Sequence, residues 1–147
     1  MGQSATHFEK LTRCGMKAKL SRFLNQEITI EKAGLARVAI PFHPELTQNA
    51  NFFHAAVLFE VGDTAGFFAV NSMEETYSVL TVDYHINLTR PVQNEGIYAI
   101  GEVITAGKTL YVARSNIYTS SGKLAAAGQG TYMITKILLA DLEGYND

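Results

Sequence analysis

The sequence lacks the features that would direct the protein into a membrane or an oxidising compartment. It has one cysteine, Cys14, and so no internal disulfide, which favours a reducing cytoplasm. Residues 1–10 contain no apolar core of the kind found in signal peptides. The longest apolar stretch, residues 51–70, is interrupted by a histidine and two acids. We therefore expect a buried core helix there rather than a membrane span.

An excess of charge of either sign is also missing. The 147 residues carry 12 lysines and arginines against 14 acids, which gives a net charge of −2. Because the charges are mixed along the chain, no basic face for a nucleic acid is expected. The 3 prolines stand at segment ends, and no linker or repeat divides the chain. With 47% hydrophobic and 18% charged residues, the composition predicts one globular domain over residues 1–147.

The sequence does contain a succession of periodic segments separated by turn residues. Helical spacing of apolar residues predicts a first helix and a long central helix, and alternating residues predict a hairpin and four further strands. The expected helices span residues 4–24 and 53–71, the hairpin 26–42, an irregular loop 41–51, the strands 80–89, 97–105, 110–119 and 124–135, and a helical turn 137–142. This order predicts an α+β fold in which an antiparallel sheet, its last four strands forming a meander, wraps around the central helix.

Two patterns predict how the central helix meets the sheet. Small residues on one side of the helix would let its backbone lie close to the strands; they are Ala55, Gly62, Gly66 and Ala69. In the strand over 80–89, apolar residues alternate with polar ones, and the apolar face is expected to cover the helix. Thr81 lies on the polar face. If the apolar face meets the helix of the same subunit, Thr81 points away from that helix and reaches a site only across a subunit interface.

The central helix also contains two acids, Glu60 and Asp63, and no lysine or arginine. A buried carboxylate without a compensating partner costs several kcal/mol, so both acids are candidates for a functional role. Ala56, Glu60 and Asp63 are spaced i, i+4 and i+7 and share one helix face. Asp63 is the candidate nucleophile or general base. The amides that begin the helix near His54 have no helical partner and are candidates for holding an oxyanion.

Geometry constrains how these groups can combine. Ala56 and Asp63 are about 10 Å apart along the helix axis, whereas a base and an oxyanion donor must both lie within about 3 Å of one carbonyl. One helix cannot supply both groups, but two antiparallel copies can. If Asp63 and the Ala56 amide act together, the protein is a homodimer with two shared sites.

Each candidate also has a structural interpretation. Asp63 can be a structural acid capped by a hydroxyl group or water, and Glu60 can be an acid in a pocket wall. His54 is expected to orient the amides at the start of the helix. Gln48 and Asn49 either orient water and substrate or satisfy backbone groups of their own loop. The histidines lie on different segments without a cysteine partner, so no metal site is expected.

Several of these segments together resemble the signature of hotdog-fold thioesterases of the phenylacetyl-CoA (PaaI-like) type. His54-Ala55-Ala56 followed by Asp63 stands where that family has His-Gly-Gly and an acid nine residues after the histidine. The other similar segments are the family's loop, third strand and next hairpin, at residues 46–53, 79–91 and 101–110. Each motif alone is degenerate, but their order and spacing are specific.

The resemblance implies a hotdog fold, a homodimer that pairs into a dimer of dimers, and hydrolysis of an acyl-CoA thioester without a metal or redox cofactor. In that family the acid aligned with Asp63 serves as base or nucleophile, and the amide aligned with Ala56 polarises the thioester carbonyl. Thr81 aligns with a hydroxyl residue that assists catalysis in some relatives. Arg90 and Lys108 align with residues that often lie near the CoA phosphates.

The chain departs from the family pattern at several positions. Asn51 replaces the loop glycine, and asparagine tolerates the left-handed backbone better than most residues. Ala55 and Ala56 replace both motif glycines; the Ala56 amide remains, but its methyl group can crowd the thioester. Aromatic residues such as Phe53 are expected in the core or the pocket wall and suit an aromatic or medium-length acyl group. The catalytic candidates are thus Asp63, Ala56, Gln48 and Thr81, and the candidate substrate contacts are Asn49, Asn51, Phe53, His54, Ala55, Glu60, Arg90 and Lys108.

Two other functions stay open from the sequence. The alanines in place of glycines favour a non-catalytic hotdog module that binds acyl-CoA. A hotdog dehydratase or hydratase needs a histidine and an acid that converge on a carbon acid, and Phe42-His43-Pro44-Glu45 is a weak match to that need. The thioesterase interpretation ranks ahead of both because the position of Asp63 and the resemblance agree.

Overall fold

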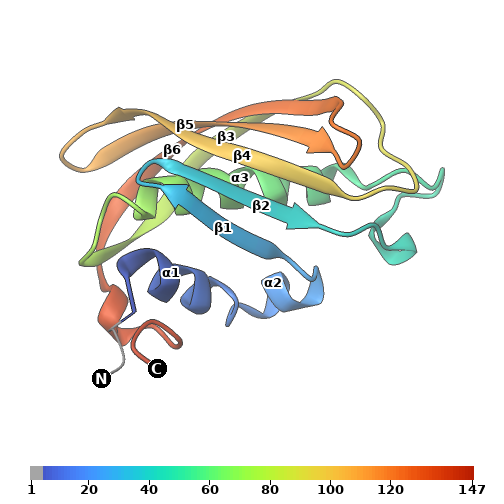
Figure 1. Cartoon of the computed structure of the whole chain (residues 1–147). Coiled ribbons are helices and arrows are strands. Elements are labelled where there is room, and N and C mark those ends of the chain that lie inside the picture. The colour runs from blue at the N-terminus through green and yellow to red at the C-terminus, as the bar shows by residue number, and fades with distance from the viewer. Residues whose placement is uncertain (1–4) are drawn as a thin grey trace.

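The fold is a curved antiparallel sheet wrapped around one long helix, seen in a computed structural model that describes residues 5–147 (Figure 1). The six strands lie in the order β1-β2-β4-β5-β6-β3. The strands are β1 (Glu27–Lys32), β2 (Leu35–Ile40), β3 (Tyr77–Leu88), β4 (Ile97–Ala106), β5 (Leu110–Thr119) and β6 (Leu124–Leu138). The helices are α1 (His7–Gly15), α2 (Lys19–Phe23) and α3 (Ala55–Asn71), with short 3-10 turns η1 (Pro44–Leu46) and η2 (Leu139–Asp141). The predicted α+β class is confirmed.

The central helix α3 begins and ends close to the predicted positions. His54 has an extended backbone (φ −64°, ψ 139°) and its side chain accepts a hydrogen bond from the Ala56 N–H, which caps the helix and starts it at Ala55. It ends at Asn71, as predicted. Because most of its residues from Val61 onward are buried, α3 forms the centre of the core.

Glycines let α3 and the sheet approach each other closely. A Cβ atom added at Gly101 of β4 would lie 2.2 Å from the carbonyl oxygen of Ala65, and one added at Gly66 would lie 2.2 Å from the Tyr132 hydroxyl. Neither position has room for a side chain. The predicted stripe of small residues is therefore confirmed for Gly62, Gly66 and Ala69, which are buried. It is wrong for Ala55, which is exposed at the start of the helix.

The single N-terminal helix predicted over residues 4–24 is wrong, because α1 and α2 form two short helices instead. Residue 4 lies outside the described residues. A capping box between Thr6 and Glu9 starts α1. The chain then turns at Met16 and becomes extended at Ala18 (φ −62°, ψ 130°). This break lets both helices follow α3, on the side away from β4 and β5 (Figure 1).

The last four strands do not form the predicted meander. β4, β5 and β6 are consecutive neighbours, but β3 pairs with β6, and β4 pairs with β2. β3 therefore lies at the outer edge of the sheet within the part of the chain that the structure describes. β3 and β4 are separated in the sheet because each pairs with a strand that is distant in the sequence. Such pairing does not change the alternation of residues within a strand, so the sequence pattern does not reveal it.

A β-bulge in β3 overturns the predicted alternation. The pairing with β6 shifts register between Thr81 and Asp83, so Val82 is an extra residue in the ladder. Before the bulge, the inward side chains are Val79 and Thr81; after it, they are Tyr84 and Ile86, whereas Leu80 and Val82 are 50% and 56% exposed. An extra residue exchanges the two faces of a strand. Thr81 consequently points toward α3 of its own chain, and the predicted orientation is wrong.

The C-terminal tail returns to α1, as its position beside the N-terminal helices in Figure 1 shows. Arg13 donates hydrogen bonds to the carbonyl oxygens of Gly144 at 2.6 Å and Tyr145 at 2.8 Å. A His7 ring nitrogen lies 2.8 Å from the Tyr145 hydroxyl. The helical turn predicted within residues 137–142 is present as η2. The two ends of the described chain thus pack together beneath α3.

Candidate active site

The carboxyl group of Asp63 lies between α3 and the edge strand β3. Thr81 donates a hydrogen bond to Asp63 Oδ1 at 2.9 Å, and the Tyr132 hydroxyl donates to the Asp63 backbone carbonyl at 3.1 Å. Burial raises the pKa of Asp63, while hydrogen bonds from the Thr81 and Tyr132 hydroxyls oppose that shift. The result is a half-buried acid in a fixed position. Its raised pKa makes the Asp63 carboxylate a stronger base than an exposed aspartate, which suits a general base.

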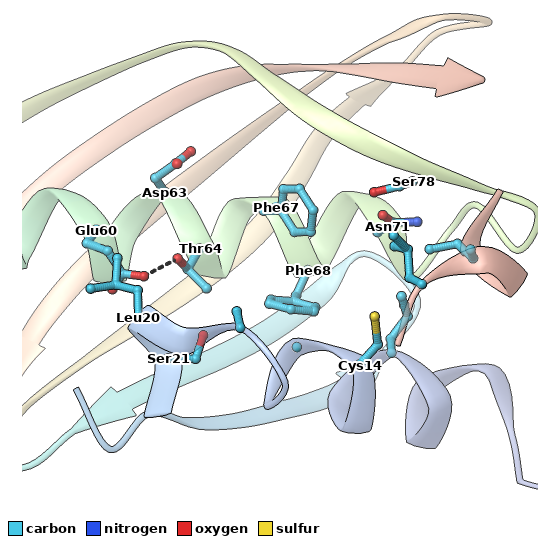
Figure 2. A pocket seen from close by; sticks show the side chains of 15 residues that line it. Cys14, Leu20, Ser21, Glu60, Asp63, Thr64, Phe67, Phe68, Asn71 and Ser78 are labelled. Atoms are coloured by element: carbon cyan, nitrogen blue, oxygen red, sulfur yellow. Dashed lines mark hydrogen bonds between the residues drawn. The ribbon is translucent and has the colours of Figure 1, made fainter. Parts of the chain in front are cut away.

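Glu60 lies one helical turn before Asp63 and is held by two donors. Thr64 donates to Glu60 Oε1 at 2.8 Å, and Gln26 of the segment before β1 donates to Oε2. Burial raises the pKa of Glu60, the two hydrogen bonds lower it, and the charge of Asp63 raises it further. Both acids line the same pocket, which lies between α3 and the N-terminal helices and has a volume of about 330 Å³ (Figure 2). This agrees with the interpretation of Glu60 as a pocket-wall acid.

The beginning of α3 forms a second, separate region. His54 Nδ1 accepts the Ala56 N–H at 3.0 Å, and both Ala55 and Ala56 are exposed. The predicted role of His54 in orienting the helix start is thus consistent with its contact. That contact also occupies the Ala56 N–H. The N–H can donate to a substrate carbonyl oxygen only if the hydrogen bond is shared between the two acceptors or if the His54 ring moves aside.

The loop before α3 brings several sequence candidates to this region. A cavity of about 390 Å³ is lined by ten residues, four of which are the candidates Gln48, Phe53, Ala55 and Arg90. Asn51 has a φ of +67°, so asparagine supplies the left-handed backbone where the family has glycine. The Gln48 side chain accepts the N–H of Ala50 within its own loop. This contact favours the structural interpretation of Gln48.

Two candidates lie apart from both regions. Asn49 is an exposed loop residue that lines neither cavity. Lys108 is exposed in the turn between β4 and β5, and it also lines neither cavity. His43, from the weak dehydratase motif, accepts the Glu45 N–H at 3.1 Å and caps η1, which is a local structural contact.

Within one chain, the acid and the helix start therefore belong to different cavities. Asp63 lines the first and Ala55 the second, and about 10 Å of helix axis separates Ala56 from Asp63. The arrangement can bind and activate water at one end, and offer an amide donor at the other. A single chain does not bring the two functions to one point.

The structure adds residues that sequence reasoning missed. Tyr132 is fully buried under α3 and positions the Asp63 backbone, and burial raises the pKa of its hydroxyl. The alternation of residues in β6 could have placed Tyr132 on the inward face, and Gly66 on α3 leaves the room that its hydroxyl occupies. Gln26 is 3% exposed and clamps Glu60. Nothing in the sequence connects Gln26 with Glu60, because 34 residues separate them.

Residues 5–147 contain neither a metal-binding cluster nor a membrane-spanning helix. No cluster of three or more His, Cys, Asp or Glu side chains suited to a metal ion occurs among these residues. In the same range, no helix has both the length and the apolar character needed to cross a membrane.

A sheet wrapped around a long helix that presents an acid beside a pocket is the architecture expected for the hotdog-fold thioesterases. The chain belongs to the thioesterase superfamily, whose family model matches residues 50–126 of its 147. That segment contains α3, β3, β4 and β5. The predicted hotdog fold and family are therefore confirmed, and the general activity that membership supports is hydrolysis of thioesters or esters.

Individual relatives agree with this assignment. A thioesterase family protein from Silicibacter pomeroyi has a TM-score of 0.83 and 28% identity, over 90% of this chain and 99% of that one. The PaaI protein of the E. coli phenylacetic acid degradation operon has a TM-score of 0.81 and 21% identity, over 92% and 99%, which shows a shared fold. The protein named "Putative esterase SSO1253" from Saccharolobus solfataricus is 26% identical over 116 residues, 79% of this chain and 77% of that protein.

Proposed function

We propose that the protein hydrolyses acyl-CoA thioesters, with Asp63 of one subunit and the Ala56 amide of the partner subunit acting on the same thioester. The observation that carries the proposal is the position of Asp63, fixed by Thr81 beside a largely apolar pocket in a chain of the thioesterase superfamily. A cytoplasmic location and a reaction without metal or redox cofactor are part of the same proposal.

The proposed chemistry uses the ionised carboxylate of Asp63. Acting as a base, it takes a proton from a water molecule while the water oxygen attacks the thioester carbonyl carbon. The carbonyl oxygen becomes an oxyanion, which accepts a hydrogen bond from the partner subunit's Ala56. When the intermediate collapses, the carbon–sulfur bond breaks, and the thiolate leaves and takes up a proton. Direct attack by the carboxylate, with a mixed anhydride that water then hydrolyses, uses the same two groups.

The edge of the sheet supports a homodimer. β3 is the outer strand of the described sheet, and the apolar side chains of Leu80, Val82 and Leu88 on it are 50%, 56% and 52% exposed. An edge strand with exposed apolar residues is a ready surface for pairing with a second copy. A twofold axis that lies at this edge and perpendicular to α3 would turn the second α3 antiparallel to the first, which is the relation that the shared site requires. Pairing of such dimers into a tetramer is a further expectation from the family resemblance.

Cations and loop amides have secondary roles in the proposal. Arg90 lines the cavity at the start of α3 and is exposed, so it can meet a CoA phosphate there. Lys108 lies at a different turn and would reach a CoA bound to another subunit of the assembly. Gln48 lines the same cavity, and a contact of Gln48 or of its neighbour Asn49 with water or substrate requires the loop to rearrange, because the Gln48 side chain accepts the Ala50 N–H.

A thiol-release assay over a series of acyl-CoAs tests the activity. We expect turnover by the native protein and a loss of at least about a hundredfold in Asp63→Asn, because the amide cannot take the proton from water. Glu60→Gln is the matched control, since it changes an acid in the same pocket. Tight binding of acyl-CoA without turnover would instead identify a binding module. The hydrogen bond from the Ala56 N–H to His54 favours that alternative, because it leaves the amide less free to hold an oxyanion.

Mixed dimers test whether the site is shared. Ala56→Pro removes the N–H in the first turn of α3, where proline is tolerated, and Ala55→Pro is the control that keeps the Ala56 amide. Asp63→Asn and Ala56→Pro subunits should each be inactive alone. When mixed, heterodimers regain one intact site, so random mixing restores about a quarter of native activity. If no activity returns although mass measurements show that heterodimers have formed, the site is not shared between subunits.

A further inference from the structure

The pocket beside Asp63 is built by distant parts of one chain. α3 forms one wall, α1 and α2 form the opposite wall, and the lining is completed by Ser78 of β3 and by Leu139 and Leu142 of the C-terminal tail. Figure 2 shows Glu60 and Asp63 toward one end of the pocket and Asn71 at the other, with Phe67 between them. The pocket therefore begins at the proposed catalytic acid and runs along α3 toward its C-terminus.

The polarity of this pocket changes along its length. Two acids, Glu60 and Asp63, lie at the end where the proposed chemistry takes place. At the far end, the Asn71 amide donates to the carbonyl oxygens of Glu74 and Tyr77, and its oxygen accepts the N–H of Val79. Asn71 is thus already satisfied. The walls between the ends are mostly apolar, with side chains that include Leu11, Leu20, Phe67 and Phe68. An apolar group that fills the space between the ends would pack on these apolar walls.

Two estimates of size agree. The pocket volume is about 330 Å³, and at the roughly 30 Å³ that a water molecule takes in the liquid, it holds about ten groups the size of a methylene. From Asp63 to Asn71 the helix rises about 12 Å, which is the span of about ten bonds in an extended chain.

We propose that this pocket receives the acyl group of the substrate, and that the wall formed by α1 limits that group to about ten non-hydrogen atoms. The proposal rests on acyl-CoA as the substrate class. It assigns the N-terminal helices a role in selecting the acyl group, because they supply the wall opposite α3.

The α1 wall is held firmly in place. A Cβ atom added at Gly15 would lie 2.5 Å from Phe68 Cζ, so the α1 backbone packs directly on a ring of α3. A His7 ring nitrogen lies 2.9 Å from the Asn71 carbonyl oxygen. Cys14 lines the pocket from α1, and Figure 2 shows its sulfur directed toward the far end. A wall anchored at both ends does not yield easily to a longer chain.

Because Cys14 is the sole cysteine in the sequence, it reports directly on the pocket. The native protein is treated with N-ethylmaleimide at mildly alkaline pH, since burial raises the pKa of this thiol, and alkylation is followed by mass. Non-hydrolysable S-alkyl-CoA thioethers of short, ten-carbon and long chains are added in turn. The ten-carbon thioether should slow alkylation at least tenfold, and CoA alone should have no effect. Binding of the thioethers without protection of Cys14 overturns the proposal.

A substitution at the same position tests the limit on length. Cys14→Phe should lower kcat/KM for a ten-carbon acyl-CoA at least tenfold while changing that for a four-carbon acyl-CoA less than threefold. Arg22→Phe, at an exposed position of α2, is the matched control and should leave both unchanged. An equal fall for both substrates contradicts the proposal. If Cys14→Phe does not fold, the labelling result on the native protein decides.

The outcomes separate this inference from the proposed function. Protection of Cys14 by thioethers in a protein that hydrolyses no acyl-CoA supports the acyl pocket and contradicts the hydrolase. Hydrolysis that Asp63→Asn abolishes, without protection of Cys14, supports the hydrolase and places the acyl group elsewhere.

Discussion

Replacement of Thr81 by valine removes the hydrogen bond that the structure places on Asp63 Oδ1. Valine keeps the branched shape and removes the hydroxyl that donates to Oδ1 at 2.9 Å. A hydrogen bond to a charged group contributes about 1.5–3 kcal/mol, and we take the lower end because both side chains are partly exposed. Loss of the donor favours the protonated acid. The pKa of Asp63, already raised by burial, should therefore rise further.

The pH dependence of kcat/KM measures this effect. On the acid limb, where Asp63 ionises, Thr81→Val should reduce kcat/KM about tenfold, which corresponds to about 1.4 kcal/mol. At alkaline pH, activity should return toward the native value, because the acid is ionised in both proteins. Thr29→Val, at an exposed position of β1, controls for loss of a hydroxyl from a strand. An acid limb that stays in place, or an equal loss at every pH, would refute the assignment of Thr81 as a donor to the catalytic base.

Four further substitutions test the electrostatics and the packing. Because burial raises the pKa of Asp63 in the folded protein, ionisation of this acid lowers the free energy of unfolding as the pH rises above 3.8, the ordinary pKa of aspartate. Asp63→Asn should therefore add about 1 kcal/mol to the free energy of unfolding in urea at neutral pH. Below pH 3.8, where the acid is protonated, the substitution should add nothing. Gly101→Ala places a Cβ atom 2.2 Å from the Ala65 carbonyl oxygen and should cost about 3 kcal/mol or more. Gly122→Ala, which meets only open space but has a φ of +90°, should cost about 1 kcal/mol. Arg13→Ala removes two hydrogen bonds to the C-terminal tail, so hydrogen exchange in residues 139–147 should accelerate while exchange in the sheet stays unchanged.

Local patterns account for the elements that were predicted well. The apolar run with its two acids predicts α3 within two residues at its start, and the alternating segments place each strand within a few residues. Gly34, with a φ of +84°, and Gly122, with a φ of +90°, lie in the turns between β1 and β2 and between β5 and β6. These features depend on neighbouring residues, so the periodicity of the sequence carries them. The break between α1 and α2 was missed because no proline or strong turn sequence marks it.

The features that decide the site depend on contacts between distant segments. Asp63 and its place on the helix face were readable from the sequence, because helical spacing alone sets that face. The side to which Thr81 points was not readable, because one extra residue in the pairing of β3 with β6 reverses it. The clamp of Gln26 on Glu60 and the α1 wall around Cys14 likewise arise only when the chain folds back on α3. Helical period is a property of the local backbone, whereas strand register and pocket walls are set by packing across the whole core.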